Sequence, residues 1–285
     1  MELLKGKPVA DQLAGHIEQN FDHLIANNIA PTLAIIRVGN NESDIAYENS
    51  AVKKAQSFGI GVEKFIFDEK ADEDDVIEVI KYINENESMH GILMFRPLPK
   101  HMDEERVCNH IAQEKDIDGI TDKSLTGIFT GKGGGFPPCT AEAAMTILKY
   151  YGIELAGKKA VVVGRSMVVG KPAAMMLMDE NATVTVCHSR TPEEDLKKYC
   201  QDADIIITAA GKRNMITAEH VNGKQIVIDV GINFDEEGKM CGDADFAGLE
   251  GKVKAITPVP GGVGGVTTTL LMYHVTAAAM AQLGK

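Results

Sequence analysis

The fold is decided by residues 160–172, which read AVVVGRSMVVGKP. The β-branched run Ala160–Val163 predicts a buried strand, and residues 169–179 predict a helix. Gly164 lies between them, where a glycine turn lets backbone N–H groups and a helix N-terminus face an anionic group. The stretch therefore predicts a nucleotide-binding strand–turn–helix unit. Gly170 is the only other glycine, so the turn is not GxGxxG, and a purely structural turn is the alternative.

The chain on both sides of this unit alternates apolar, β-rich runs with helical patterns. Such alternation predicts an α/β fold with a mostly parallel, doubly wound sheet of Rossmann type. A length of 285 residues suggests about two domains. Residues 119–138, rich in glycine and proline, predict a loop and a domain boundary. Further strands are predicted at 32–38, 62–67, 91–95, 183–187, 205–209, 226–229 and 253–256, and further helices at 8–27, 43–58 and 141–151.

Composition argues against several classes of protein. Twenty-nine Lys and Arg against 41 Asp and Glu leave a net charge of −12, which disfavours nucleic acid or an anionic membrane as a partner. The five cysteines are scattered without metal-ligand spacing, which indicates a reduced, cytoplasmic protein with no metal. Residues 1–13 lack the apolar core of a signal peptide, and residues 266–283 are too polar for a membrane span. The acidic run Asp72–Asp75 suits the first turn of a helix.

A cofactor preference follows from the end of the second predicted strand, which reads CHSRT at residues 187–191. A dinucleotide-binding unit that prefers NAD usually has Asp or Glu there, to accept from the ribose 2′-hydroxyl. His188, Ser189 and Arg190 instead offer donors and a cation that suit a 2′-phosphate. The sequence therefore favours NADP over NAD. The alternative is that His188 and Arg190 only end a strand and face solvent.

Two further motifs indicate a ligand. Residues 258–267 read PVPGGVGGVT, where prolines fix the approach and glycines expose backbone amides, as close contact with a flat ring requires; a hinge is the alternative. Asp116–Gly119 reads DIDG, and Tyr47 and the pair Lys53-Lys54 lie on an earlier predicted helix. Each of these alone is an ordinary surface feature, and their weight comes from occurring together.

Together these motifs resemble the methylenetetrahydrofolate dehydrogenase/cyclohydrolase family, the bifunctional enzymes often called FolD. The similarity covers nearly the whole chain. It runs through Arg37–Asn41 with Ser43 and Tyr47, Pro97–Pro99, Lys115–Gly119, Pro138–Thr140, Gly164–Pro172, His188–Thr191, Asp229–Asn233, Gly242-Asp243 and Thr257–Gly264.

The resemblance implies two lobes and a homodimer. Residues 1–138 would form a folate-binding catalytic domain, on which a C-terminal helix at 266–285 packs back, and residues 139–265 would form an NADP-binding Rossmann domain. It also implies a role in one-carbon metabolism and purine biosynthesis, with a small-molecule folate substrate. Hydride would pass from 5,10-methylenetetrahydrofolate to the nicotinamide of NADP and leave 5,10-methenyltetrahydrofolate.

The resemblance also assigns site residues. Tyr47 would stack on the aminobenzoyl ring of the folate, and Asp118 would hold its pterin. The loop that lines the folate and nicotinamide would comprise Pro260, Gly261, Gly262 and Val263. The residues that would bind the cofactor are Gly164, Arg165, Ser166, Val169, Gly170, His188, Ser189, Arg190, Ile232 and Thr267.

Two departures from the family pattern concern its hydrolytic half-reaction. Ala51 stands where a lysine usually follows the tyrosine by four residues, and Phe95 stands where a glutamine is usual. Hydrolysis of the methenyl cation needs an activated water and proton transfers, so we expect the cyclohydrolase activity to be lost or weak. Arg96 cannot serve as a base, because a guanidinium does not deprotonate.

Three alternatives stay open at this level. In the first, Lys54, one helical turn beyond Ala51, or Lys53 replaces the missing lysine and the enzyme is fully bifunctional. In the second, altered residues at Ala141 and Gly265-Val266 indicate a folate- or nucleotide-binding paralogue without turnover. In the third, a related two-domain dehydrogenase acts on another substrate.

Overall fold

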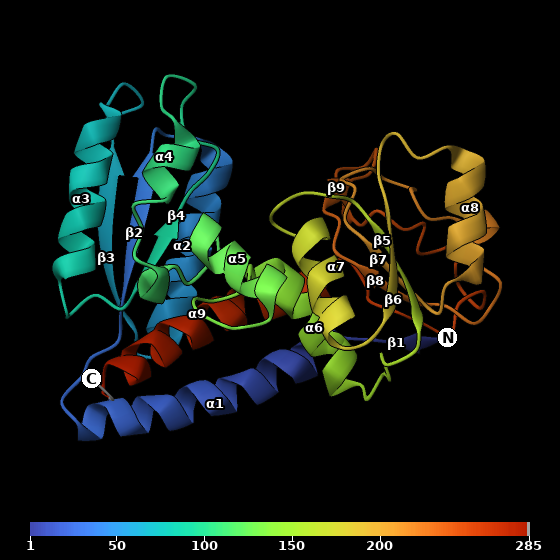
Figure 1. Cartoon of the computed structure of the whole chain (residues 1–285), viewed down its shortest axis with the longest axis horizontal. Coiled ribbons are helices and arrows are strands. Elements are labelled where there is room, and N and C mark those ends of the chain that lie inside the picture. The colour runs from blue at the N-terminus through green and yellow to red at the C-terminus, as the bar shows by residue number, and fades with distance from the viewer. Residues whose placement is uncertain (284–285) are drawn as a thin grey trace. The chain divides into compact units, whose positions relative to one another are not determined.

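The computed structural model describes residues 1–283, which form two compact units (Figure 1). Unit 1 comprises Met1–Asp11 and Thr140–Thr267, and unit 2 comprises Gln12–Cys139 and the chain from Thr268 onward. Two long helices, α1 (Gly6–Ala26) and α9 (Val263–Gln282), contribute residues to both units.

Unit 1 is built on a six-stranded parallel sheet with the order β1-β11-β8-β7-β5-β6. Val161 and Val163 of β5 pack with Leu196 and Cys200 of α8. Helix α7 packs against β5 and β6. The strands are β1 (Glu2–Leu3), β5 (Lys159–Val163), β6 (Thr183–Cys187), β7 (Ile205–Thr208), β8 (Ile226–Asp229) and β11 (Ala255–Ile256). The helices are α6 (Cys139–Tyr150), α7 (Gly170–Asp179), α8 (Glu193–Asp202) and the 3₁₀ turn η2 (Ala218–His220), and β9 (Asn233–Phe234) pairs antiparallel with β10 (Met240–Cys241).

The first eleven residues differ from the sequence expectation, which grouped them with residues 12–138. They cluster with unit 1, because β1 pairs in parallel with β11 through Glu2 opposite Ala255 and Leu3 opposite Ile256. Two residues are too short a run to show strand periodicity in the sequence.

Unit 2 is built on a three-stranded parallel sheet with the order β3-β2-β4. Because successive strand residues face opposite sides, Leu33 and Ile35 pack with α1, α2 and α9, whereas Ala34 and Ile36 pack with α3. The strands are β2 (Thr32–Val38), β3 (Gly61–Phe67) and β4 (Gly91–Met94). The remaining helices are α2 (Glu42–Ser57), α3 (Glu73–Glu85), α4 (Glu104–Cys108), the 3₁₀ turn η1 (Gln113–Lys115) and α5 (Asp122–Thr130).

The structure confirms the predicted α/β class with doubly wound parallel sheets. One local prediction is wrong, because residues 122–130 form helix α5 inside the stretch expected to be a loop. Thr121 caps that helix, its side chain accepting from Ser124 N at 3.2 Å, and Gly131 ends it in the left-handed conformation. The glycines that suggested a loop therefore lie within and around a short helix.

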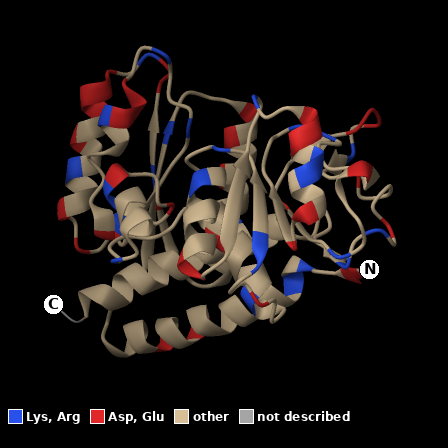
Figure 2. Ribbon diagram, turned by 45° about the vertical axis from the view of Figure 1, so that its right-hand side comes forward, with Lys and Arg blue, Asp and Glu red and all other residues tan. Residues whose placement is uncertain are grey.

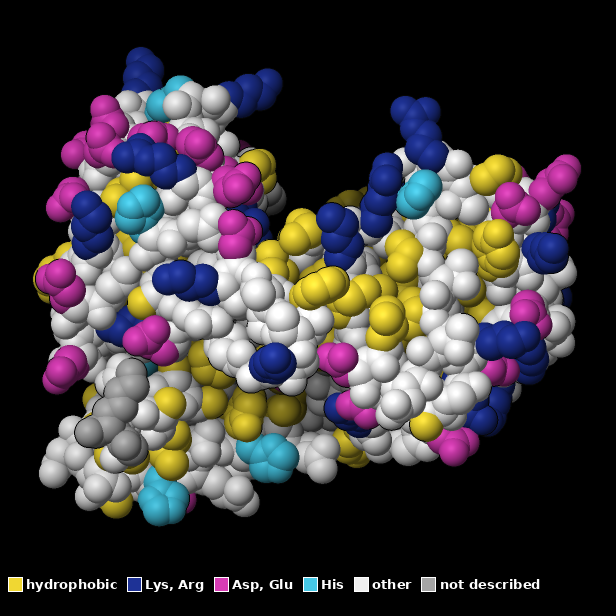
Figure 3. Space-filling model, viewed as in Figure 1, with side chains coloured by type: hydrophobic (Ala, Val, Ile, Leu, Met, Phe, Trp, Pro, Cys, Tyr) yellow, Lys and Arg dark blue, Asp and Glu magenta, His cyan; other side chains and the backbone are white. Residues whose placement is uncertain are grey.

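Charged groups serve the helices in the way the sequence suggests. Asp72 caps α3, its carboxylate accepting from Asp74 N at 3.0 Å, and the acidic first turn of that helix is visible in Figure 2. Figure 3 shows positive and negative side chains interspersed on the face that it presents. Among the described residues, no cluster of His, Cys, Asp and Glu could hold a metal ion, and no helix is long and apolar enough to cross a membrane.

Candidate active site

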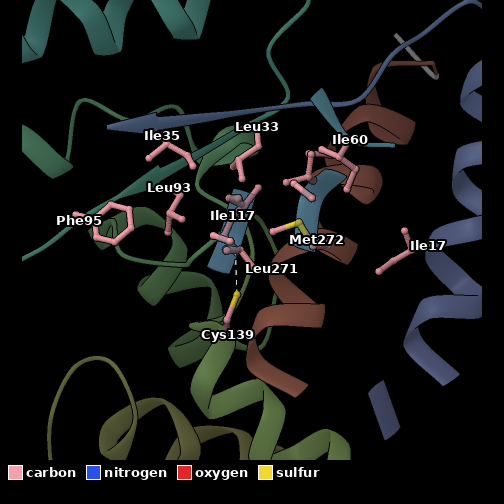
Figure 4. Close-up of a cluster of buried hydrophobic side chains, with 14 residues drawn as sticks. Ile17, Leu33, Ile35, Ile60, Leu93, Phe95, Ile117, Cys139, Leu271 and Met272 are labelled. Carbon is pink, nitrogen blue, oxygen red and sulfur yellow. Dashed lines mark hydrogen bonds between the residues drawn. The ribbon is translucent and has the colours of Figure 1, made fainter. Parts of the chain in front are cut away.

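Tyr47 lies on α2 and faces Phe95, which follows β4. Their rings meet edge to face, with centroids 5.7 Å apart. Ala51, one turn beyond Tyr47, is 0% exposed, and Phe95 is 8% exposed. Both belong to the apolar cluster drawn in Figure 4, together with Leu93 and Leu271. Positions 51 and 95 are therefore filled by close hydrocarbon packing.

A buried ion pair fixes α2 on the sheet. Glu48, next to Tyr47, accepts from Arg37 Nε of β2 at 2.7 Å and from Lys64 Nζ of β3 at 2.8 Å. Burial alone would raise the pKa of Glu48, but the bonds from Lys64 and Arg37 outweigh it and lower that pKa. The sequence analysis missed Glu48, although Arg37 in an apolar strand was a usable signal for a buried carboxylate.

Asp118 lies in the tight turn after η1. Hydrogen bonds and close packing from neighbouring residues hold the backbone of this turn. The Asp116 carboxylate accepts from Ile120 N at 2.9 Å and from Thr121 N at 2.8 Å. Gly119 has φ +62°, and a Cβ there would collide with the backbone of residues 136–138. The turn therefore requires glycine directly after Asp118.

The electrostatics of Asp118 and Tyr47 are coupled. Burial raises the pKa of Asp118, while Arg96 and the nearby Cys139 thiol oppose that shift without cancelling it. Tyr47 keeps 39% of its surface exposed, yet desolvation of its hydroxyl, aided by Asp118, raises the pKa of that group. Tyr47 therefore remains a neutral hydrogen-bond donor with an accessible ring.

The cations near this site have partners of their own. Lys54 Nζ lies 5.0 Å from the centroid of the Phe58 ring, toward the end of α2, and Lys53 is exposed. Arg96 Nη1 lies 3.8 Å from Glu104 Oε1. In this arrangement the ammonium of Lys54 packs on Phe58.

In unit 1, the glycine turn joins β5 to α7 as predicted. Gly164 has φ +135°, and a Cβ there would collide with the Ala209 carbonyl; a Cβ on Gly170 would collide with the Gly164 carbonyl. Val169 N donates to Ser166 Oγ at 3.1 Å. The turn therefore packs closely against neighbouring backbone where α7 begins. The N–H groups at the N-terminus of a helix can face a bound pyrophosphate.

The neighbouring turn after β6 lies at the same edge of the sheet, because Val163 is the register partner of Cys187. His188 Nδ1 accepts from Arg190 N at 3.2 Å, so its hydrogen lies on Nε2, which can donate outward. The exposed polar side chains on these two turns are Arg165, Ser166, Ser189 and Arg190. Two guanidinium groups with several donors fit an adenosine that carries an extra phosphate.

Two buried carboxylates organise the loops after β7 and β8, near the exposed Ile232. Asp243 accepts from Ala210 N at 2.6 Å, Gly211 N at 3.0 Å and Lys212 N at 2.9 Å. Asp229 accepts from the backbone amides of residues 231, 243 and 244. Burial raises the pKa of Asp229 to about 6, with Asp243 adding to burial and the amides opposing it. The sequence analysis gave these two residues no role beyond the family motif.

The predicted folate loop, Pro260–Val263, leads into α9 in unit 1, and Val263 is the first residue of that helix. Gly261 has φ +103°, its carbonyl accepts from Gly6 N at 2.9 Å, and a Cβ on Gly262 would lie 2.5 Å from the Pro258 carbonyl. Thr267 Oγ1 donates to Val263 O at 3.2 Å inside α9. Tyr47, Phe95 and Asp118 lie in unit 2, whereas this loop and the predicted cofactor residues lie in unit 1.

Comparison with known proteins agrees over the full length of the chain. Residues 4–118 match the catalytic-domain model of tetrahydrofolate dehydrogenase/cyclohydrolase, and residues 138–283 match its NAD(P)-binding domain. A bifunctional FolD protein of Alkaliphilus metalliredigens is 46% identical over 281 residues, which cover 99% of this chain and 98% of that protein.

Solved structures give the same result. The bifunctional FolD enzyme of Campylobacter jejuni is 37% identical, covers 99% of both chains and superposes with a TM-score of 0.96. A Trypanosoma brucei methylenetetrahydrofolate dehydrogenase-cyclohydrolase, solved with NADP and an inhibitor, is 29% identical with a TM-score of 0.92 and covers 99% of this chain and 98% of that one. The chain therefore belongs to the tetrahydrofolate dehydrogenase/cyclohydrolase family, and it is an oxidoreductase with a nicotinamide cofactor and a folate substrate.

Proposed function

We propose that this enzyme is an NADP-dependent 5,10-methylenetetrahydrofolate dehydrogenase whose cyclohydrolase activity is lost or very weak. The observation that carries the proposal is the apolar filling of positions 51 and 95 beside Tyr47. Ala51 and Phe95 are buried in one hydrophobic cluster and supply neither an acid nor a base. Hydrolysis needs such a group to activate water and to move protons.

Hydride transfer makes smaller demands on the protein. The donor carbon must be held close to C4 of the nicotinamide in the correct orientation, and the lone pair of the bridging nitrogen supplies the electron push. NADP supplies the hydride acceptor when it is bound. A site that positions its reactants and excludes water can therefore complete this step without a general base.

The site residues have the following proposed roles. Tyr47, neutral and 39% exposed, stacks on the aminobenzoyl ring, and Asp118 accepts hydrogen bonds from the pterin. Pro260–Val263 offers backbone for close approach to the flat rings. Residues 164–170 hold the pyrophosphate, and His188–Arg190 with Arg165 hold the adenosine 2′-phosphate; Ile232 and Thr267 complete the cofactor set.

A coupled assay tests the proposal. Purified enzyme with methylenetetrahydrofolate and either NADP or NAD is followed simultaneously for reduced cofactor and for absorbance of the methenyl cation. We expect reduction of NADP with a stoichiometric build-up of the methenyl product. Conversion of that product to 10-formyltetrahydrofolate as fast as it forms would overturn the loss of hydrolysis.

A second candidate is the fully bifunctional enzyme, which is favoured by the names of the relatives. It requires Lys54 or Lys53 to act in place of residue 51, and Lys54 would have to leave the Phe58 ring to do so. Changing both lysines to methionine should then abolish hydrolysis and spare NADP reduction. Hydrolysis that survives in the double variant would eliminate this candidate.

We also propose a cytoplasmic homodimer without a nucleic-acid partner. The family resemblance supports the dimer, and the net charge of −12 disfavours polyanions. Sedimentation equilibrium at micromolar concentration tests the oligomeric state, and a monomer at all concentrations would refute the dimer.

A further inference from the structure

His274 on α9 is a buried ring that the proposed mechanism does not use. It is 1% exposed, and it stacks on Phe136 with centroids 4.5 Å apart and planes inclined by 26°. Its Nδ1 lies 2.7 Å from the carbonyl oxygen of Ile117. A carbonyl oxygen can only accept, so Nδ1 must carry a hydrogen and donate it. The Ile117 carbonyl therefore fixes the orientation and the protonated nitrogen of this ring.

A second donor reaches the same oxygen. Cys139 Sγ, also buried, donates to Ile117 O at 3.3 Å, the bond drawn as a dashed line in Figure 4, and lies 3.5 Å from His274 Nδ1. A carbonyl oxygen has two lone pairs, so it can accept both bonds. Two segments of unit 2 that are far apart in the sequence thus converge on one backbone atom.

This atom matters because of the residue that follows it. The carbonyl of Ile117 and the amide of Asp118 belong to one planar peptide group, so a fixed oxygen fixes the plane from which the Asp118 side chain projects. On the other side of the turn, the Asp116 carboxylate holds the amides of Ile120 and Thr121. Asp118 is therefore held in place from both directions, and His274 supplies the shorter of the two bonds on the upstream side.

We propose that His274 is a positioning residue for folate: by donating to Ile117 O, it aims the Asp118 carboxylate at the pterin. The inference rests on the proposed function, in which Asp118 binds that ring. It connects the C-terminal helix to substrate affinity through the Ile117 carbonyl. A misplacement of about 1 Å in such a group can cost about a hundredfold, so loss of the bond should weaken folate binding and leave NADP binding intact.

Three variants of His274 separate positioning from simple packing. In His274→Asn the amide nitrogen occupies the place of Nδ1 and keeps the donor, whereas His274→Leu has a similar shape without a donor or a charge. His274→Gln keeps a polar side chain but places its amide nitrogen near the position of Nε2. Folding of each variant is checked by thermal unfolding and by its Kd for NADP.

The readouts are the Kd for tetrahydrofolate, by calorimetry with NADP present, and the KM and kcat for methylenetetrahydrofolate. We expect His274→Leu and His274→Gln to raise the folate Kd and KM by about tenfold or more. The Kd for NADP should stay within about twofold. His274→Asn should retain folate affinity close to the parent. Unchanged folate affinity in a folded Gln or Leu variant, or equal losses in all three variants, would overturn the proposal.

Asp118→Asn distinguishes failure of this inference from failure of the proposed function. If Asp118→Asn leaves folate affinity unchanged, the assigned role of Asp118 is wrong. If it weakens affinity but His274→Gln does not, only the positioning role is wrong. When both roles hold, the double variant Asp118→Asn with His274→Gln should bind folate about as weakly as Asp118→Asn alone. Once the carboxylate has been removed, its orientation no longer affects binding. If the folate-affinity losses of the two single variants multiply in the double variant, His274 does not act through Asp118.

Discussion

At the scale of single residues, the chemistry of the site depends on what fills two positions beside Tyr47. Ala51 and Phe95 pack in the same buried cluster. A lysine and a glutamine of similar reach could hydrogen-bond each other there, but either one alone would bury a polar group without that partner. The two residues therefore act as a pair.

The pair leads to a gain-of-function prediction. The double variant Ala51→Lys with Phe95→Gln should increase hydrolysis of methenyltetrahydrofolate by about a hundredfold or more, because it supplies a base and a group to orient it. Hydrolysis is measured directly on the methenyl substrate without NADP. The control is Ala55→Lys with Phe95→Gln, which places the ammonium one turn further along α2. A double variant that folds but hydrolyses the methenyl substrate no faster than the parent would count against the proposal that positions 51 and 95 determine cyclohydrolase activity.

A pH dependence belongs to Asp229. Its folded pKa of about 6 lies above its ordinary value of 3.8, so the folded state binds the proton more tightly. Proton binding to Asp229 therefore makes its full contribution to the free energy of unfolding below about pH 4. This contribution falls as the pH rises to about 6 and is constant above that. The total loss is about 3 kcal/mol.

Urea unfolding of the parent and of Asp229→Asn between about pH 4 and pH 7 measures this effect. The stability of the parent minus that of the variant should fall with rising pH and level off above about pH 6. A difference that rises over this range would show that the amide donors outweigh burial.

At the scale of elements, Lys115 ties η1 to the end of α3. Its ammonium, in a residue only 4% exposed, donates to Ile83 O at 2.6 Å and to Asn86 O at 2.8 Å, and each of these carbonyls also accepts one backbone amide. Lys115→Met should destabilise the protein by about 3 kcal/mol in chemical unfolding, because it removes two charge-assisted hydrogen bonds from a buried site. The control is Lys81→Met on the exposed face of α3, which loses a pair with Glu78 and should cost less than about 0.5 kcal/mol.

Elements differ in how well the sequence predicts them. Strands β2, β6 and β8 match their predicted bounds, because runs such as Thr32–Val38 are β-branched and end at clear breaks. Helix α5 was missed, because Gly127 and the glycines after residue 130 obscured its period. A Cβ on Gly127 would lie 2.6 Å from the Gly134 carbonyl, so that glycine serves close packing rather than a loop.

The candidate site shows the same division. The family resemblance singled out Tyr47, Ala51 and Phe95. Glu48, Lys115 and His274 received no individual role, because the evidence for each lies in contacts with segments distant in the chain. In a single sequence, a histidine in an apolar helix looks like part of the core, and only the carbonyl that it meets gives it a role.

At the scale of the whole molecule, the preference for NADP over NAD should be measurable as a difference in how much each cofactor stabilises the folded protein. A ligand that binds only the folded state adds about 2.7 kcal/mol at a hundred times its Kd. NADP should therefore raise the midpoint of thermal unfolding more than NAD does at equal concentration. Arg190→Ala should remove most of that difference, and the control Lys239→Ala, whose partner is Glu237, should keep it. Equal shifts by NADP and NAD in the parent would refute the preference.

The packing around Ala51 and Phe95 also determines how a polar pair could be introduced there. Changing the two positions to lysine and glutamine one at a time would pass through a single variant with a buried polar group that lacks its intended partner. Each single variant should therefore be less stable than the double variant. The two substitutions should show strong epistasis, so that neither one alone reveals the effect of the pair.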